Sequence, residues 1–196
     1  MSTSATDDGR PRCWPATDPL YVVYHDDEWG RPVVDERGLY ERLCLEGFQS
    51  GLSRLTILRK REGFRDAFAG FDPERVAAFG ERDVERLLAD AGIVRHRGKI
   101  EAAIANARAT LALREEGSRL PELVWAYRRD GPAPTTWDAE TPGSRELSRR
   151  LKAAGFRFVG PTTVHSTMQA CGIVNDLRAG CWVRDAVEAE RATASP

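Results

Sequence analysis

Glu46 is the first residue of this chain whose type and position suggest chemistry. It lies seven residues after Leu39 and three after Leu43, so the three side chains share one face of a predicted helix. That face is apolar, and a carboxylate buried there without a partner is costly. Acidic side chains whose pKa values are strongly shifted by burial are frequent at functional sites. We therefore predict a catalytic role for Glu46, unless its side chain turns to solvent or pairs with an arginine elsewhere.

A second set of candidates forms an aromatic cluster on one short predicted helix. Tyr21, Tyr24 and Glu28 share one face of this helix, and Tyr21, His25 and Trp29 share another. Aromatic side chains that carry a hydroxyl or an N–H group can both stack on a flat ligand and hydrogen-bond it. The cluster indicates a ligand pocket, with ordinary core packing as the alternative.

Cys13, His25 and Cys181 are the candidate metal ligands. Structural zinc sites use four Cys or His ligands in a tetrahedron. The spacing here is long and contains none of the usual close ligand pairs, so these residues alone give a weak signal. A shared metal would bring the two ends of the chain together. Cys44 and Cys171 indicate burial or metal binding rather than disulfides, which are rare in a reducing compartment.

The segment around 90–99 joins two helical patterns across a very short gap. Apolar residues repeat at helical spacing before it and again after it. We predict that Gly92 caps the first helix and that Gly98 makes a second tight turn, which exposes backbone N–H groups beside a helix N-terminus. Ringed by cations, such a turn suits the phosphates of a nucleic acid, and a solvated basic turn is the alternative. The predicted contacts are Gly92, Val94, Arg95, Arg97, Gly98 and Lys99.

Composition limits the classes of protein to consider. The chain has 196 residues, 41% hydrophobic and 30% charged, which is ordinary for a soluble globular protein of one sizeable or two small domains. Its formal net charge is −1, so any nucleic-acid site must come from local basic clusters. We find no apolar stretch of membrane-spanning length and no signal peptide, and we expect a cytoplasmic protein.

Helix signals dominate, and we predict an all-α fold. The stretch 131–142 is expected to be a loop, and the alternation at 156–159 is too short to seed a sheet. We expect one domain over 12–183, a disordered N-terminus at 1–11 and a C-terminal tail, also disordered, at 184–196. The predicted helices cover 18–29, 35–51, 53–61, 72–79, 81–91, 99–115, 120–129, 144–154 and 161–171.

Several stretches together resemble one known family. The chain resembles the 3-methyladenine-DNA glycosylase I family, whose members are helix-hairpin-helix DNA glycosylases, over roughly residues 12 to 182. A set of motifs in the same order is far more specific than any single motif. The matching stretches are DPLY and YHDDEWG within 18–30, CLEG at 44–47, GLS at 51–53, ILRKRE at 57–62, the hairpin at 90–99, GFRFVG at 155–160 and MQACGIVND at 168–176.

The resemblance implies a helix-hairpin-helix fold, an added zinc-binding substructure that joins the chain ends, and excision of methylated adenine from DNA. It implies that Glu46 reads the exocyclic amine and N7 of the damaged base. Tyr24 corresponds to a pocket tyrosine, and Tyr21 and Trp29 to pocket aromatics. The segment 92–99 corresponds to a hairpin that anchors DNA.

Two positions depart from the family pattern. Where the family has a tryptophan that stacks on the excised base, this chain has Arg54. A planar guanidinium can also stack on a base, but it does so as a cation. Where the family has a histidine as the fourth zinc ligand, this chain has Leu177. The resemblance therefore leaves three matching zinc ligands, Cys13, His25 and Cys181.

We predict a monofunctional DNA glycosylase that hydrolyses the N-glycosidic bond of alkylated adenine in DNA and so starts base excision repair. Chemistry on a base requires its removal from the stack. Gly51 and Leu52 are expected to contact the DNA, with Leu52 or a neighbour filling the gap, while Glu46 orients the base. An N3-alkylated purine already carries positive charge, so stabilisation of an oxocarbenium-like sugar and a positioned water suffice. No lysine is placed to form a Schiff base, so we expect no lyase activity.

The expected partner is double-stranded DNA with alkylated bases, bound by a monomer, with no membrane and no protein partner. The expected cofactor is structural zinc, weakened or lost because Leu177 replaces a ligand. Arg54 belongs to the predicted base-binding site, where it could contact a bulkier or uncharged adduct. The alternatives are a glycosylase for such an adduct, a DNA-damage-binding protein without catalysis, and a small-molecule enzyme that uses the aromatic pocket.

Overall fold

The computed structural model describes residues 8–196, which form helices joined by turns and loops. Within this range the only β pairing is an isolated bridge between Arg129 and Val174, and 156–159 forms no strand, so the all-α prediction is confirmed. No helix in this range is long and apolar enough to cross a membrane. The elements are α1 Pro19–Val23, the π-helical turn η1 Tyr24–Glu28, α2 Glu36–Gln49, α3 Arg54–Ala67, the 3-10 turn η2 Ala69–Phe71, α4 Pro73–Ala77, α5 Glu81–Ala89, α6 Arg97–Glu115, α7 Leu120–Trp125, α8 Pro142–Ala153, α9 Pro161–Ala170 and α10 Arg184–Thr193.

Several helices begin where the sequence places capping residues. The side chains of Asp18, Asp35, Ser53 and Asp72 each accept a hydrogen bond from a backbone N–H group in the first turn of the helix that follows. A proline follows two of these caps at the start of the helix. Because a cap satisfies an N–H group that the helix cannot satisfy itself, these starts can be predicted from the sequence.

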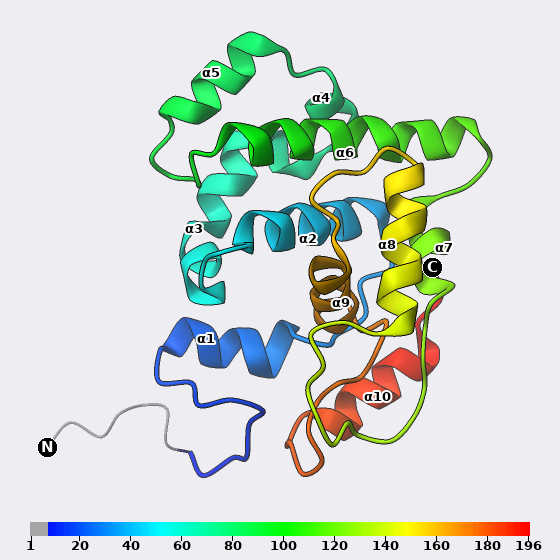
Figure 1. The fold of residues 1–196 in the computed structure, drawn as a ribbon. Coiled ribbons are helices and arrows are strands. Elements are labelled where there is room, and N and C mark those ends of the chain that lie inside the picture. The colour runs from blue at the N-terminus through cyan, green and yellow to red at the C-terminus, as the bar shows by residue number, and fades with distance from the viewer. Residues whose placement is uncertain (1–7) are drawn as a thin grey trace, which may run out of the picture.

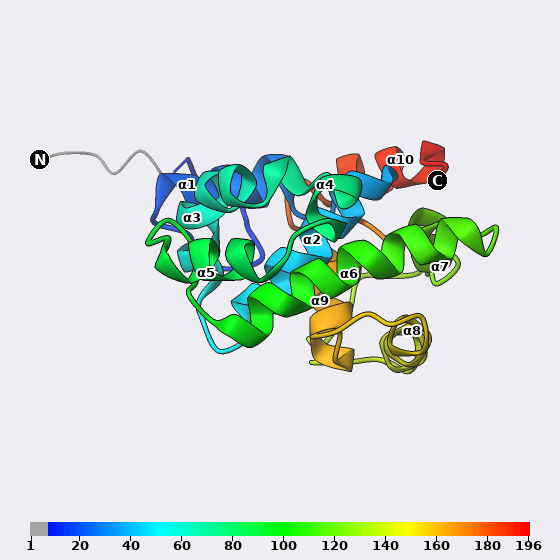
Figure 2. The same ribbon diagram turned by 90° about the horizontal axis from the view of Figure 1, so that it is seen from above.

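α2 is the central helix of the fold. It packs against α3, α6, α7 and α9, while α4 and α5 pack on α6, and α8 packs on α9. In Figure 1, α6 crosses above α2, and α9 lies below it. In the view turned by 90° (Figure 2), α8 and α9 lie on one side of the molecule and α1 and α10 on the opposite side. Polar side chains on the inner face of α2 therefore need partners within the protein.

A row of phenylalanines fixes the end of α2 against α3. Phe48, Phe64, Phe68 and Phe71 are almost completely buried. The ring centroids of Phe48 and Phe64 lie 4.6 Å apart, and those of Phe68 and Phe71 lie 5.5 Å apart. Because α2 carries Glu46 and α3 begins at Arg54, this packing also fixes the frame in which those two side chains meet.

The segments around Cys13 and Cys181 meet, as the sequence predicted for a shared site. The N–H group of Trp182 donates to the Pro11 carbonyl oxygen at 3.1 Å. Cys13, Leu177 and Cys181 belong to a second, smaller apolar cluster beside the main core. Of the predicted disordered N-terminus 1–11, residues 1–7 lie outside the described residues.

The prediction of a disordered tail at 184–196 is wrong for most of its length, because α10 docks on the body of the protein. Arg191 is fully buried at its C-terminal end. The guanidinium donates to the carbonyl oxygens of Gly172 at 2.6 Å, Arg129 at 2.9 Å and Ile173 at 3.2 Å. These partners lie far from Arg191 in sequence, so the local composition of the tail did not reveal them.

We predict that Arg191→Ala destabilises the protein by roughly 2–4 kcal/mol, because it removes a fully buried guanidinium together with its bonds to three carbonyl groups. The midpoint of thermal unfolding should fall by roughly 5–15 °C, measured by circular dichroism. Glu190→Ala, one residue away at an exposed position, is the control and should change stability by less than about 1 kcal/mol. Equal effects of the two substitutions would contradict the docking of α10 through Arg191.

Candidate active site

Glu46 lies near the end of α2 and is buried, with 7% of its surface exposed. Its Oε1 accepts a hydrogen bond from Nη1 of Arg54 at 2.6 Å, and Nη2 of the same guanidinium lies 3.5 Å from Oε2. The carboxylate is therefore inside the protein and paired with an arginine, which is the alternative that the sequence left open for Glu46. A buried ion pair of this kind holds both groups in place, since removal of either partner leaves an uncompensated charge.

Arg54 faces Glu46 because the chain reverses between α2 and α3. Gly51 adopts a left-handed conformation with a φ of 79°, which glycine takes readily, and Ser53 caps α3. Nη1 of Arg54 also donates to the hydroxyl of Tyr24 at 2.9 Å. Burial alone would lower the pKa of Arg54, but Tyr24 and Glu46 raise it above its ordinary value, so the guanidinium stays charged.

Tyr24 is buried between two guanidinium groups. The Cζ atoms of Arg54 and Arg42 lie 5.5 Å and 5.9 Å from the centre of its ring, within the range of cation–π attraction. Burial raises the pKa of Tyr24 to about 12, so its hydroxyl is neutral near pH 7. Tyr24 is thus a rigid, neutral hydrogen-bonding group beside the ion pair.

An aromatic cavity of about 250 Å³ opens at Arg54. Tyr21 and Trp29 line it, as the sequence predicted, together with Trp14 and Trp137. The ring centroid of Trp14 lies 5.0 Å from that of Trp29 and 5.4 Å from that of Tyr21. Several aromatic rings around one cavity suit a flat heteroaromatic ligand.

Arg54 stands between this aromatic cavity and Glu46. It lines the aromatic cavity and also a space of about 20 Å³ that Glu46 and Tyr24 border. The predicted base-binding residues therefore form two groups, Tyr21 and Trp29 on one side and Tyr24 and Glu46 on the other. A ligand in the aromatic cavity therefore contacts the guanidinium that is paired with Glu46.

The π-helical turn η1 directs neighbouring side chains to different parts of the structure. The N–H group of Trp29 donates to the Tyr24 carbonyl at 2.8 Å, five residues back, which marks the widened turn. Such turns occur often at functional sites. Tyr24 points to the ion pair and His25 to the candidate metal ligands. Glu28 serves structure instead, because its carboxylate pairs with Arg42 and Arg61.

Cys13, His25 and Cys181 come together as predicted, with ligand atoms within 4.8 Å of one another, and all three are buried. Nδ1 of His25 lies 2.7 Å from the Asp26 carboxylate, a contact typical of metal-binding histidines. Burial lowers the pKa of His25, which favours the neutral imidazole that binds metals. These residues fit three corners of a zinc tetrahedron, while Leu177 is fully buried and offers no donor.

The hairpin between α5 and α6 is pressed against α3 by a close backbone approach. A Cβ atom at Gly63 would lie 2.8 Å from the carbonyl oxygen of Gly92, and Nζ of Lys60 donates to the carbonyl oxygen of Ala91 at 2.7 Å. Gly92 is not left-handed, so the predicted glycine cap is wrong. Asp90 ends α5 instead, and its side chain accepts from the N–H group of Gly92 at 2.7 Å.

The start of α6 offers free backbone donors. Gly98 lies in the first turn of α6 and not in the separate turn that the sequence predicted, because His96 is the N-cap. In the part of the chain that the structure describes, the backbone N–H groups of Val94, Arg95, Arg97 and Gly98 donate no hydrogen bond. Free donors beside the N-terminus of a 19-residue helix suit a phosphate oxygen.

The side chain of Lys99 connects the hairpin to the end of α2. Its ammonium group donates to the carbonyl oxygens of Phe48 at 2.9 Å and Ser50 at 2.6 Å, and the residue is buried. The ammonium satisfies carbonyl groups at the end of α2, and a contact of Lys99 with DNA stays a prediction from the sequence. Arg97 pairs with Glu81 at 2.8 Å, whereas Arg95 is exposed on the tip.

Sequence reasoning missed several residues that line the aromatic cavity, namely Trp14, Trp137, Asp138 and Gln169. Gln169 lies in a stretch that matched the family, but no role was predicted for it. Its amide donates to Asp176 at 2.9 Å, which fixes its orientation. The one available signal for Trp137 was a large aromatic residue within a polar, proline-rich loop.

Comparisons with known proteins agree with one another. Residues 14–185 match the family described as methyladenine glycosylase. The chain is 51% identical over 177 residues to DNA-3-methyladenine glycosylase 1 of Escherichia coli (strain K12), covering 87% of this chain and 95% of that protein. A crystal structure of 3-methyladenine DNA glycosylase I matches with a TM-score of 0.83 and 50% identity, covering 88% of this chain and 98% of that one. A variant of such an enzyme in complex with 3-methyladenine matches with a TM-score of 0.81 and 34% identity, covering 86% and 94%.

Proposed function

The chain belongs to the methyladenine glycosylase family, and we propose that it hydrolyses the N-glycosidic bond of 3-methyladenine in DNA. The observation that carries this function is a buried carboxylate paired with Arg54, whose side chain also lines an aromatic cavity. The rings suit a flat purine. A carboxylate suits a base that carries positive charge and an exocyclic amine, so Glu46 supplies the recognition that the aromatic rings cannot.

The substrate has to reach this site from within DNA. Extrusion of a base costs a few kcal/mol and is easiest for damaged bases. The free N–H groups at the start of α6 support phosphate binding at the hairpin, and Gly51 and Leu52 lie exposed on the loop after α2. We propose that the hairpin holds the backbone and that Leu52 fills the space of the extruded base. Binding as a monomer to duplex DNA in the cytoplasm stays a prediction from the sequence.

The charge of the substrate explains how a base can reach Glu46 past Arg54. An N3-alkylated adenine is a cation while it is attached to the sugar, so it can replace the guanidinium as the counter-ion of Glu46. Arg54 is then free to turn toward the cavity mouth or toward a DNA phosphate. The exchange keeps the buried carboxylate paired throughout, which avoids the large penalty of an isolated buried charge.

Cleavage of the glycosidic bond reverses the competition between the base and Arg54 for Glu46. When the bond between N9 and the sugar breaks, its electron pair stays on the base, so the cationic substrate becomes a neutral product. The sugar becomes an oxocarbenium-like cation, which water attacks with loss of a proton. A neutral base competes poorly with a guanidinium for Glu46, so the return of Arg54 favours release of the product.

The residues of the site favour hydrolysis without lyase chemistry. The chain contains only three lysines, Lys60, Lys99 and Lys152. None of them lines the aromatic cavity, and Lys60 and Lys99 are occupied with backbone carbonyl groups. A Schiff base with the sugar needs a free amine at the reacting carbon. We therefore propose a monofunctional glycosylase.

We further propose that Cys13, His25 and Cys181 bind a structural zinc ion with three protein ligands. The proposal rests on their mutual distances, their burial and the contact between His25 and Asp26. Burial raises the pKa of Cys13 to about 12, and a bound cation would favour its thiolate. Leu177 leaves the fourth corner without a protein donor, so the affinity should be below that of a complete site.

A protein that binds damaged DNA without catalysis is the second candidate, favoured by the closed pair of Glu46 and Arg54. A base-release assay separates the two. With the protein in excess over methylated duplex DNA, we expect 3-methyladenine to appear as free base while the strands stay intact until alkali cleaves them. Salt-dependent binding without free base would favour the second candidate, and absence of DNA binding would contradict both.

We predict that Arg54→Gln makes the enzyme sensitive to its product, because glutamine keeps a hydrogen-bond donor but lacks the charge that competes with the neutral base. The inhibition constant of free 3-methyladenine should fall by about tenfold or more, which corresponds to ~1.4 kcal/mol. Steady-state turnover should fall relative to the single-turnover rate. Arg65→Gln, on the same helix and outside both cavities, is the control. Unchanged product inhibition in Arg54→Gln would remove Arg54 from product release.

We predict that Leu177→His raises the zinc affinity of the purified protein, since it adds a fourth donor to the three-ligand cluster. Zinc retained against a chelator, measured by elemental analysis, should rise in this variant and fall in Cys181→Ser. Cys44→Ser changes a buried cysteine outside the cluster and should leave zinc retention unchanged. Equal zinc content in all of these proteins would contradict the proposed site.

A further inference from the structure

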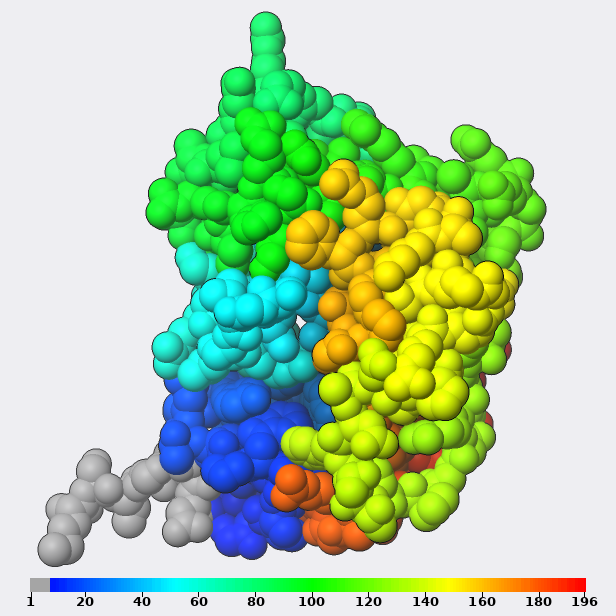
Figure 3. All heavy atoms as spheres, in the orientation of Figure 1, coloured from blue at the N-terminus to red at the C-terminus, as the bar shows by residue number. Residues whose placement is uncertain are grey.

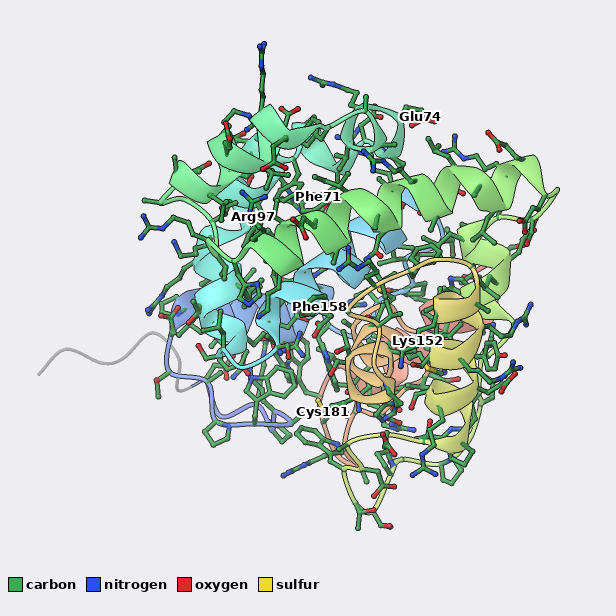
Figure 4. The ribbon with its side chains drawn as sticks, turned by 45° about the horizontal axis from the view of Figure 1, so that its top comes forward. Phe71, Glu74, Arg97, Lys152, Phe158 and Cys181 are labelled. Atoms are coloured by element: carbon green, nitrogen blue, oxygen red, sulfur yellow. The ribbon has the colours of Figure 1, made fainter. Side chains whose placement is uncertain are left out.

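Phe158 is an exposed aromatic residue in a strained backbone conformation. Its φ is 55°, in the left-handed region that a bulky side chain rarely adopts, and 40% of its surface is exposed. It lies on the loop between α8 and α9, where Figure 4 labels it beside α6. Packing accounts for only part of the surface of this ring, so the exposed part in a strained position points to a further role.

The loop that carries Phe158 is held firmly on both sides. Asn106 is buried, and its side chain bonds both the N–H group and the carbonyl oxygen of Arg157, at 2.7 Å and 3.1 Å. The hydroxyl of Ser148 donates to the Val159 carbonyl at 2.6 Å. These bonds maintain the strained conformation of the residue between them, and they fix the direction in which the exposed ring points.

The ring lies against the hairpin and α2. Its centroid is 6.3 Å from that of His96, in an edge-on arrangement. A Cβ atom at Gly98 would lie 3.9 Å from the ring, and one at Gly47 would lie 3.5 Å from the Cβ atom of Phe158. Figure 3 shows a hollow between the cyan surface near residue 50 and the orange surface near residue 160. Phe158 therefore belongs to the face that carries the phosphate-binding hairpin and the loop of Leu52.

The charges around this ring favour nucleic acid as its partner. Arg157 and Arg95 are exposed, and no carboxylate pairs with either of them among residues 8–196. Proteins that distort duplex DNA commonly combine cations on phosphates with an apolar side chain inserted at a base step. Phe158 matches this combination, because its exposed ring lies beside unpaired cations and free backbone donors.

We propose that Phe158 is a DNA wedge, which stacks on a base next to the position that the extruded adenine has left. This rests on the proposed function, because it requires duplex DNA at the hairpin. Stacking of a base on an aromatic side chain is strong and tolerates every base, so the wedge adds affinity for distorted DNA without sequence preference. Leu52 and Phe158 then support the opened duplex from two separate loops.

Phe158→Asn tests the wedge without adding backbone strain, because asparagine adopts the left-handed conformation more readily than phenylalanine. With a duplex that carries 2-aminopurine beside the lesion, the native protein should raise the fluorescence by unstacking the probe. In Phe158→Asn the rise should largely disappear, and affinity for the lesion duplex should fall about tenfold. Binding of undamaged duplex at low salt, inhibition by free 3-methyladenine and the thermal midpoint should change little. Phe158→Trp should restore the fluorescence response.

Val23→Asn removes another exposed apolar side chain, on α1, and is the matched control, expected to behave as the native protein. Native fluorescence response and lesion affinity in Phe158→Asn would overturn the wedge. So would a large drop of its thermal midpoint together with equal losses on damaged and undamaged DNA, since these indicate a structural role. These outcomes leave the proposed function standing, because base release by the native protein tests it separately.

Discussion

The ion pair between Glu46 and Arg54 is the interaction on which the rest of this site depends. A carboxylate on the inner face of the central helix requires a partner, and Arg54 provides one at 2.6 Å while it also bonds Tyr24. The same guanidinium borders the aromatic cavity, so one side chain both stabilises the carboxylate and contacts the space proposed for the base. Charge is then the property that decides which ligands can reach Glu46.

A few local features of the fold bring Glu46 and Arg54 together. The left-handed Gly51 and the cap at Ser53 reverse the chain. Packing of Phe48 on Phe64 fixes the position of α2 relative to α3. The ammonium of Lys99 ties the end of α2 to the hairpin, so the segment that would hold a phosphate and the segment that would fill the DNA stack are one connected unit. DNA bound at the hairpin is therefore placed at a defined distance from the site.

Local sequence signals predicted most of the helices. The features that the sequence did not predict depend on tertiary contacts. Caps such as Asp35 act within one turn, so the helix starts could be predicted, and helical spacing placed Glu46 on the inner face. The use of Lys99 as a cap and the docking of α10 through Arg191 depend on residues distant in sequence. The partner of Glu46, Arg54, lies on the next helix and meets it only because the chain reverses between them. A pattern with a period of one helical turn carries no information about such pairs.

The single-turnover rate of 3-methyladenine release in Glu46→Gln tests the account most directly, because glutamine keeps the size of the side chain and removes its charge. Glu41→Gln lies on the same helix as Glu46, loses an ion pair with Arg65 of α3, and controls for stability. We expect a fall of about a hundredfold or more for Glu46→Gln with unchanged binding to undamaged duplex, and a rate near the native one for Glu41→Gln. A native rate in Glu46→Gln would contradict it.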